Sequence, residues 1–175
     1  MSALPYVSVR IPGGTLTVVV GATESGADVV LGSSFRGIGD IRGRLESELT
    51  FRKAALESVT SVITRYCDGY FPALDEVAVA QHGGPFQQAV WRAMREIPAG
   101  AVESYGEVAR RAGRARAYRA VGTACAVNIT APFVPCHRVV AAGGLGGYGY
   151  GLEVKIALLA HEGVVFESDR PQVTR

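Results

Sequence analysis

The spacing of apolar residues changes near residue 83, and this change limits the folds that the chain can adopt. Before it, short apolar runs between glycine and proline turns predict a small antiparallel sheet, followed by one helix with apolar residues three or four apart. The expected strands are residues 6–10, 16–20 and 27–31, and the expected helix is residues 52–66.

After residue 83 the apolar spacing is helical throughout. Ser104 and Glu107 are three residues apart and fit a capping box at a helix start. A tight turn rich in arginine then separates two short helices, which resembles a helix-turn-helix, although helical hairpins are also common in proteins that never meet DNA. The expected helices are residues 86–97, 105–112, 118–127 and 152–161.

The stretch between the two patterns, residues 71–84, has the proline and glycine content of a linker. The sequence therefore predicts an α+β protein with a boundary there. We expect an N-terminal α/β domain over residues 1–82 and a mostly helical C-terminal domain, which carries the helix-turn-helix, over residues 83–175. At 175 residues the chain is long enough for one large domain or two small ones.

Positive charge is concentrated in the middle of the chain. Residues 91–119 hold seven arginines and three glutamates, whereas residues 1–82 hold seven basic and nine acidic side chains. A basic segment in an otherwise balanced chain suits contact with a phosphate backbone, and a solvated arginine-rich helix face is an equally good explanation of the charge alone.

The cysteine content points to a reducing compartment. Cys67, Cys125 and Cys136 are an odd number without close pairing, which argues against a disulfide framework. No apolar run is long enough for a membrane helix and the start does not resemble a signal peptide, so we expect a cytoplasmic, nucleoid-associated protein. No metal is expected, because only Cys67 and His82 offer zinc ligands in the N-terminal part.

The most specific feature is the run from Val134 to Val140, in which Cys136 precedes His137. A cysteine attacks carbon as a thiolate, so a neighbouring base has to take its proton. In an extended segment adjacent side chains point to opposite faces, and a bridging water would then link the two residues. Glu162 is the best placed acid to orient the base. The alternative is a buried structural cysteine beside a chance histidine.

The sequence Pro135-Cys136-His137-Arg138-Val139 resembles the acceptor-site signature of the O(6)-alkylguanine-DNA alkyltransferases, also called methylated-DNA–protein-cysteine methyltransferases. The resemblance covers the second half of the chain almost continuously. It also includes the runs 86–91, 104–106, 119–122 and 158–163. The resemblance implies a single-turnover repair protein that flips O6-alkylguanine out of double-stranded DNA and transfers the alkyl group irreversibly to its own cysteine.

Under this resemblance, Cys136 is the acceptor and His137 is the base that acts through water. Glu162 orients the histidine, and Asn128 is a hinge that holds the recognition helix against the acceptor segment. Tyr105 donates its phenol to the departing purine, although it could equally be a core tyrosine at a capped helix start. No cofactor is implied, and we expect a monomer.

The resemblance also implies a DNA-binding set and a pocket for the flipped base. Arg119 would fill the space that the flipped nucleotide leaves, whereas without the motif it reads as a phosphate contact. The remaining DNA-binding residues would be Tyr118, Ser104, Gly106, Gln87 and Arg114. The pocket would be lined by Pro135, Val139, Tyr148 and Gly149, in a glycine-rich segment that could equally be a floppy loop.

The sequence departs from the family pattern at Ile129, at Tyr118 and at Ala131-Pro132-Phe133, which replaces a more usual aliphatic run. Ile129 follows Asn128 where the family usually has proline, and Tyr118 stands where a small residue normally enters the minor groove. Two other functions compete with repair: a cysteine hydrolase that uses Cys136, His137 and Glu162, and a DNA-binding module that senses lesions without repairing them. The hydrolase lacks an evident oxyanion hole, and sensing relatives lack the acceptor cysteine.

Overall fold

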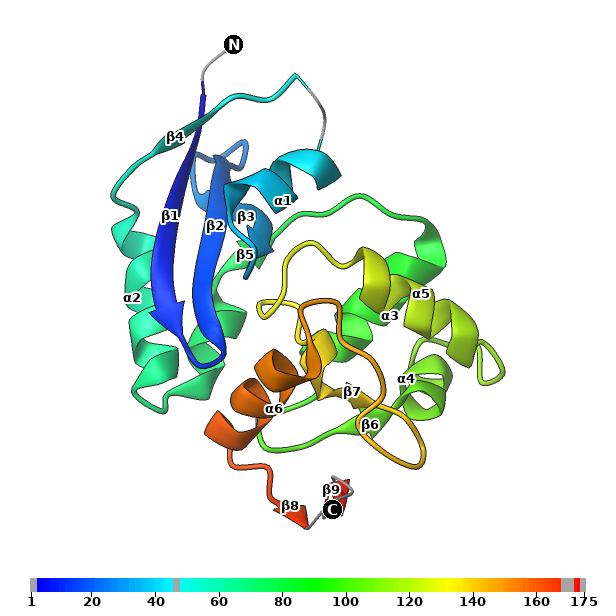
Figure 1. Ribbon diagram of the computed structural model, residues 1–175. Coiled ribbons are helices and arrows are strands. Elements are labelled where there is room, and N and C mark those ends of the chain that lie inside the picture. The colour runs from blue at the N-terminus through cyan, green and yellow to red at the C-terminus, as the bar shows by residue number, and fades with distance from the viewer. Residues whose placement is uncertain (1–2, 46–47, 168–171, 174–175) are drawn as a thin grey trace. The chain divides into compact units, whose positions relative to one another are not determined.

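The computed structural model describes residues 3–45, 48–167 and 172–173. The chain forms two compact units (Figure 1). Unit 1 comprises Met1–Gln81 and Ile129–Phe133, and unit 2 comprises His82–Asn128 and Val134–Arg175. The class is α+β, as predicted. The division into an N-terminal and a C-terminal functional domain at residue 82 stays a prediction.

Unit 1 is built on a five-stranded sheet in the order β4-β1-β2-β3-β5. Its strands are β1 (Leu4–Ile11), β2 (Gly14–Ala22), β3 (Asp28–Ser34), β4 (Phe51–Lys53) and β5 (Ala78–Val79). The hairpin β1–β2 turns at Gly13, whose φ of 93° suits a residue without a Cβ. The predicted antiparallel sheet was incomplete, because β4 and β5 add to it in parallel on either side.

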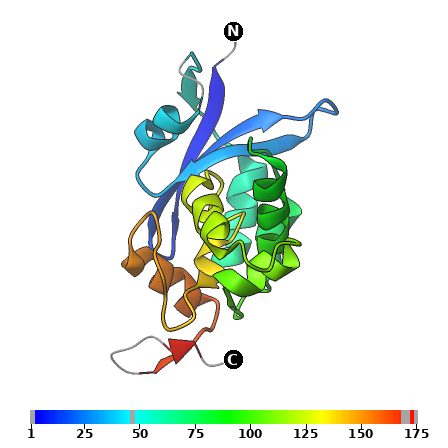
Figure 2. The same cartoon turned by 90° about the vertical axis from the view of Figure 1, so that its right-hand side faces the viewer.

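Two helices lie on opposite sides of this sheet (Figures 1 and 2), α1 (Ile38–Arg44) and α2 (Glu57–Cys67). The predicted helix over residues 52–66 was too long at its start, because Phe51–Lys53 pairs with β1 instead. Its apolar face is as expected, with Val59, Val62 and Ile63 buried. The sequence did not predict α1, which buries only Ile41.

The stretch 71–84 is more ordered than a linker. It contains the 3-10 helix η1 (Phe71–Glu76), which buries Ala73 and Leu74, and then the strand β5. The linker prediction was therefore wrong for most of this stretch, because Pro72 lies in the first turn of a 3-10 helix and not in a flexible connection, whereas Gly83 and Gly84 lie outside both elements. No helix among the described residues combines the length and apolar character that crossing a membrane requires.

The described residues of unit 2 form four α-helices and a short parallel pair of strands (Figure 1). The helices are α3 (Pro85–Arg95), α4 (Tyr105–Arg111), α5 (Tyr118–Val127) and α6 (Leu152–His161), and the strands are β6 (Glu103–Ser104) and β7 (Val139–Val140). The hairpin β8 (Phe166–Glu167) and β9 (Gln172–Val173) follows α6. The four predicted helices are present, and the last two have the predicted bounds.

Local sequence signals explain where these helices begin. Ser104 accepts a hydrogen bond from the backbone N–H of Glu107 at 3.2 Å, and the Glu107 carboxylate accepts one from the backbone N–H of Ser104 at 2.7 Å. This is the predicted capping box.

The contact between α3 and α5 includes Trp91, whose indole N–H donates to the carbonyl of Ala124 at 2.9 Å.

Candidate active site

Cys136 opens a single 3-10 turn, η2 (Cys136–Arg138), and not the extended segment that was considered from the sequence. The backbone N–H of Arg138 donates to the carbonyl of Pro135 and closes the turn. Successive side chains in such a turn are separated by about a third of a revolution. His137 is fully buried, whereas Cys136 keeps 7% of its surface exposed. The sulfur-bearing residue is the more accessible of the two.

Asn128 connects the end of α5 to this turn. Its side-chain Nδ2 donates to the carbonyl of Val134 at 2.8 Å and to the sulfur of Cys136 at 3.2 Å. Asn128 is buried and caps α5, where its backbone N–H donates to the carbonyl of Cys125. One side chain therefore contacts both the segment leading to the acceptor and the acceptor sulfur.

His137 and Glu162 form a fully buried pair. Nε2 of His137 lies 2.9 Å from Oε1 of Glu162, and Glu162 caps the end of α6. The structure thus brings together Cys136, His137, Asn128 and Glu162, four residues that the sequence analysis selected. Their roles in catalysis stay predictions.

Arg138 completes this buried cluster, and the sequence analysis gave it no role. Its Nε and Nη2 both donate to the Glu162 carboxylate at 2.9 Å, and its Nη1 donates to the carbonyl of Ile97 at 2.6 Å. A bidentate ion pair of this kind holds the carboxylate in one orientation. The only signal in the sequence was the position of Arg138 directly after the Cys-His pair.

The burial of this cluster sets its protonation. Burial lowers the pKa of His137, which Glu162 only partly offsets, so the imidazole is neutral at pH 7. Burial raises the pKa of Glu162, but the charge and hydrogen bonds of His137 and Arg138 outweigh this and lower it to about 2. An ionised carboxylate only accepts, so the proton of the neutral imidazole resides on Nε2 and Nδ1 carries a lone pair.

A second residue that the sequence analysis missed is Lys155 on α6. Its ammonium is buried and donates to the carbonyls of Val139, Leu145 and Gly147 at 2.7, 2.6 and 3.3 Å. Burial lowers its pKa to about 8, and the nearby Cys136 and Cys125 counteract part of that shift. A lysine three residues before Leu158, on the apolar face of α6, was the available signal.

Tyr105 lies at the start of α4, close to the glycine-rich segment. Burial raises its pKa, neighbouring Cys125 and Cys136 raise it further, and a hydrogen bond with the Gly147 backbone opposes them. A Cβ at Gly146 would lie 3.0 Å from the Tyr105 hydroxyl, and the φ of Gly146 is 69°. Glycine at that position therefore permits the segment to approach the phenol closely.

The residues predicted to line a base pocket have different degrees of burial. Pro135 and Val139 are buried, Tyr148 is half-buried and Gly149 is exposed. The rings of Tyr148 and Tyr150 meet edge to face, with centroids 5.7 Å apart. Their contact with a base stays a prediction.

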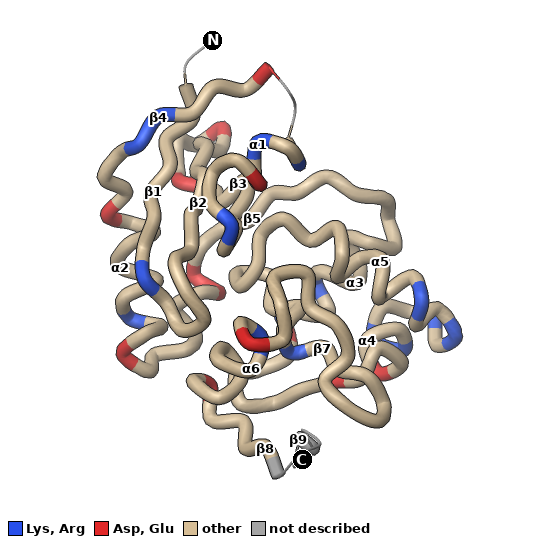
Figure 3. The backbone as a smooth tube through the Cα atoms, in the orientation of Figure 1, with Lys and Arg blue, Asp and Glu red and all other residues tan. Residues whose placement is uncertain are grey.

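The predicted DNA-binding residues fall into two groups. Arg119, Tyr118 and Arg114 are exposed at the turn between α4 and α5, where Figure 3 shows basic residues. Arg119 lies over the Tyr118 ring at 5.8 Å, and Arg114 lies over the Phe86 ring at 5.1 Å.

The other predicted DNA-binding residues lie at helix starts. Ser104 caps α4, and Gly106 lies in the first turn of that helix. Gln87 caps α3, where its Oε1 accepts from the backbone N–H of Gly84 at 2.8 Å. Capping already explains Ser104 and Gln87 without DNA.

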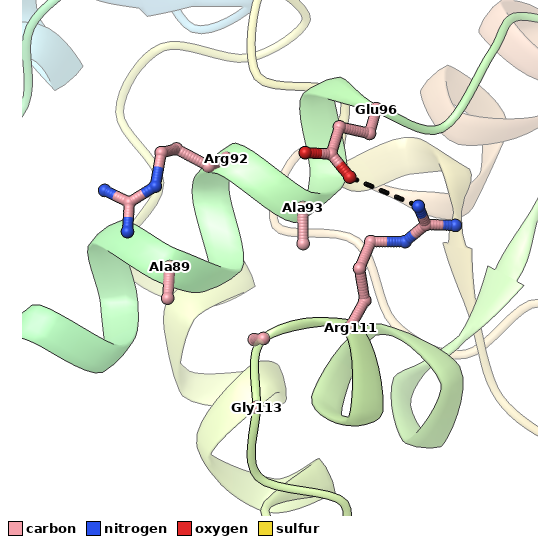
Figure 4. Close-up of a pocket in the computed structure, with 7 residues that line it drawn as sticks. Ala89, Arg92, Ala93, Glu96, Arg111 and Gly113 are labelled. Atoms are coloured by element: carbon pink, nitrogen blue, oxygen red, sulfur yellow. Dashed lines mark hydrogen bonds and ion pairs between the residues drawn. The ribbon is translucent and has the colours of Figure 1, made fainter.

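A cavity of about 290 Å³ lies between α3 and α4 (Figure 4). None of the residues that line it belongs to the predicted site, and Arg111 on its rim is paired with Glu96 at 3.2 Å. The lining residues are Ala89, Arg92, Ala93, Glu96, Arg111, Ala112 and Gly113. Across the described part of the chain, no cluster of three or more histidine, cysteine or acidic side chains is arranged to hold a metal ion.

Comparison with known proteins identifies the family. Residues 85–164 match the model of the 6-O-methylguanine DNA methyltransferase, DNA binding domain. A methylated-DNA–protein-cysteine methyltransferase of Methanosarcina acetivorans is 42% identical over 120 residues, which cover 68% of this chain and 73% of that protein. One of Mycolicibacterium paratuberculosis is 37% identical over 160 residues, which cover 91% of this chain and 92% of that protein.

The same family appears among solved structures. The crystal structure of Mycobacterium tuberculosis OGT in complex with DNA has a TM-score of 0.71 and 32% identity, and the match covers 91% of this chain and 93% of that chain. The sequence resemblance is thus confirmed over both units. The chain belongs to the methylated-DNA–protein-cysteine methyltransferase family.

Proposed function

We propose that Cys136 is the acceptor of this family member and takes an alkyl group from O6-alkylguanine in double-stranded DNA, once per molecule. The observation that carries the proposal is the arrangement around its sulfur. Cys136 keeps limited exposure while its sequence neighbour His137 is held rigidly by a buried, ionised Glu162. This is the arrangement of a nucleophile, a base and an orienting acid.

The proton of the thiol leaves through His137. Because Nε2 donates to Glu162, the lone pair of Nδ1 is the basic position, and among the described residues Nδ1 has no protein hydrogen-bond partner. A water molecule between Sγ and Nδ1 carries the proton across. The imidazolium that forms is stabilised by the Glu162 carboxylate.

The transfer itself is an in-line displacement. The thiolate of Cys136 forms a carbon–sulfur bond with the alkyl carbon as the bond from that carbon to O6 of guanine breaks. The bonding electrons pass to the purine, and the Tyr105 hydroxyl donates a hydrogen bond to the charge that develops there. The purine anion takes up a proton from solvent, which restores guanine. Neither water nor thiols cleave the thioether, so the protein is spent. The chemistry needs no cofactor.

Access to the lesion requires that the nucleotide leave the stack, because its reactive carbon is covered inside a duplex. Arg119 and Tyr118 occupy the first turn of α5, where both are exposed and able to enter a groove. Arg119 fills the gap in the duplex, and the segment with Val139, Tyr148 and Gly149 receives the base. The relative from Mycobacterium tuberculosis forms a complex with DNA, which supports this partner.

We add three proposals about the oligomeric state, the location and the domains of the protein. A stoichiometric transfer to one sulfur requires no second subunit, so we expect a monomer. The lesion is in the chromosome, so we place the protein in the cytoplasm at the nucleoid. Cys136 and the predicted helix-turn-helix both fall within residues 83–175. We propose this range as the functional domain for DNA binding and alkyl transfer, with residues 1–82 as a separate N-terminal domain.

The test is to incubate the protein with a duplex that carries O6-methylguanine, digest it, and measure the masses of its peptides by mass spectrometry. We expect one methyl group per protein on the peptide that contains Cys136, with no further turnover. Cys136→Ala should abolish transfer and retain DNA binding, and Cys67→Ser is the matched control that should keep full transfer. Methyl on Cys125 or Cys67, or repeated turnover, would refute the mechanism. Turnover of an ester without methyl transfer would favour the hydrolase.

A further inference from the structure

The chain passes from unit 2 to unit 1 and back just before the acceptor. The five residues Ile129–Phe133, here called the crossover segment, belong to unit 1, whereas Asn128 and Val134 on either side belong to unit 2. All of the segment except Ile129 is buried. The crossover segment therefore has fixed neighbours within unit 1.

Those neighbours lie along the edge of the unit 1 sheet. β5 pairs with the first half of β3, at Val29 and Val30, and not with its second half. There Ser33 donates its backbone N–H to the carbonyl of Ile129 at 2.7 Å and its hydroxyl to the carbonyl of Ala131 at 2.6 Å. The crossover segment thus takes up the strand edge that β5 leaves.

A second side chain holds the start of the crossover segment. Oε1 of Gln81 accepts from the backbone N–H of Ile129 at 3.0 Å. Ser33 is 1% exposed and Ala131 is fully buried, so solvent cannot replace the hydroxyl if it is lost. Three hydrogen bonds from two residues therefore define where the segment lies in unit 1.

The far end of the crossover segment leads directly to the acceptor. The carbonyl of Val134 accepts from Asn128 Nδ2 at 2.8 Å and from the backbone N–H of Cys136 at 2.9 Å. The same Nδ2 contacts the Cys136 sulfur. Because Asn128 and Val134 are peptide-bonded to the ends of the segment, a shift of the segment changes the geometry around the sulfur.

We propose that Ser33 is a positioning residue for alkyl transfer, assisted by Gln81. It acts through the crossover segment and touches neither the lesion nor the acceptor. The inference rests on the proposed function of Cys136, and it makes the sheet of unit 1 part of the machinery that aims the sulfur. A misplacement of a nucleophile by about 1 Å can lower a rate by about a hundredfold.

The neighbouring residue on β3 provides a matched control. Ser34 is also buried, and its hydroxyl donates a hydrogen bond of the same length, 2.6 Å, to Asp40 on α1. Ser33→Ala removes the bond to the Ala131 carbonyl, whereas Ser34→Ala removes the bond to Asp40 and the one that its hydroxyl accepts from the backbone N–H of Arg36 at 2.9 Å. Only the first of these bonds reaches the crossover segment.

The experiment compares full-length wild-type protein, Ser33→Ala, Ser34→Ala and Ser33→Thr. The single-turnover rate of methyl transfer is measured with saturating duplex, together with duplex affinity and thermal unfolding. We expect Ser33→Ala to transfer at least about tenfold more slowly than Ser34→Ala at equal affinity, and Ser33→Thr to restore most of the rate because it keeps the hydroxyl. Equal rates for the two alanine variants would overturn the proposal.

A second measurement does not depend on DNA. The folded protein is treated with iodoacetamide over a pH series, and the rate of modification at Cys136 is measured from the peptide that contains it. The midpoint, which is the pH at which this rate is half-maximal, should shift in Ser33→Ala but not in Ser34→Ala. Should Ser33→Ala fail to fold, Gln81→Met removes a different bond to the same segment and should shift the midpoint in the same way. An unchanged midpoint contradicts the positioning role, whereas absence of methyl transfer in the wild type contradicts the proposed function instead.

Discussion

The side-chain nitrogen of Asn128 lies 3.2 Å from the sulfur of Cys136, and it also donates to the carbonyl of Val134. A donor at this distance stabilises a sulfur that carries negative charge more than a neutral thiol. The contact therefore favours the thiolate that alkyl transfer needs. It also joins the end of α5 to the segment that leads to the acceptor.

Replacement of Asn128 by alanine tests this contact. We expect the free energy of unfolding to fall by about 0.5–1.5 kcal/mol, because the Val134 carbonyl loses one donor and keeps the backbone N–H of Cys136. We expect the transfer rate to fall by more than this loss of stability explains. Urea unfolding and single-turnover transfer on one preparation check both. Thr123→Ala, which removes a 3.3 Å bond to a backbone carbonyl of the same helix, is the control. A transfer rate equal to that of the control would leave the sulfur contact without a role.

The buried His137 and Glu162 predict that acid weakens both the reaction and the fold. Burial lowers the pKa of His137, so the unfolded chain binds a proton below about pH 6.5 that the folded chain does not. Stability is lost as the pH falls below that value. The pKa of Glu162 is lowered from 4.5 to about 2, so its contribution, on the order of 3 kcal/mol, is present above pH 4.5 and lost on further acidification.

Unfolding measured over a pH series should thus show stability falling in two stages. His137→Gln should remove the first stage and abolish most transfer, because no base remains. His82→Gln changes an exposed histidine and should keep both the first stage of the stability loss and the transfer activity. The transfer rate should fall with the protonation of His137 in the folded protein. A rate that rises on acidification would show that His137 is not the base.

Local signals predicted the helices of unit 2 better than the sheet of unit 1. The bounds of α6 agree with prediction because Gly151 and Gly163 mark them within the sequence itself, and α5 ends, as predicted, where Asn128 caps it. β4 and β5 are three and two residues long and exist only because they pair in parallel with β1 and β3. Pairing partners far apart in the sequence leave no periodic pattern in so short a run.

The same distinction applies to the site. Cys136 and His137 are adjacent, and the acceptor signature is local, so they could be selected from the sequence. Arg138 and Lys155 could not, because their roles depend on partners that only the fold supplies: a carboxylate 24 residues away for Arg138 and backbone carbonyls for Lys155. Buried cations are rare without such partners.

The contribution of the buried Arg138–Glu162 ion pair to the free energy of unfolding can be compared with that of an exposed ion pair in the same unit. Arg138→Met leaves the Glu162 carboxylate buried without its main counter-charge, and we expect a loss of about 3–5 kcal/mol. Arg111→Met breaks contacts with Glu96 and Glu103, but the Arg111 side chain is 41% exposed, so we expect about 0–1 kcal/mol (Figure 4). Chemical denaturation of both variants tests the contrast, which equal losses would contradict.

Arg119 offers the sharpest test of base flipping, because its contribution should depend on the substrate. A duplex has to lose a stacked nucleotide before transfer, whereas a free alkylated base needs no flipping. Arg119→Ala should therefore slow transfer from duplex by about tenfold or more and change transfer from free O6-benzylguanine by less than about twofold.

Arg116→Ala is the control for loss of charge alone, since Arg116 is also exposed in the turn before α5. If Arg119 were only a phosphate contact, both variants would weaken duplex binding similarly and reduce its salt dependence by a similar amount. A finger that fills the gap left by the flipped nucleotide instead predicts a rate defect in Arg119→Ala that persists at saturating duplex. Recovery of the full transfer rate at saturating duplex would show that Arg119 contacts only the phosphate backbone.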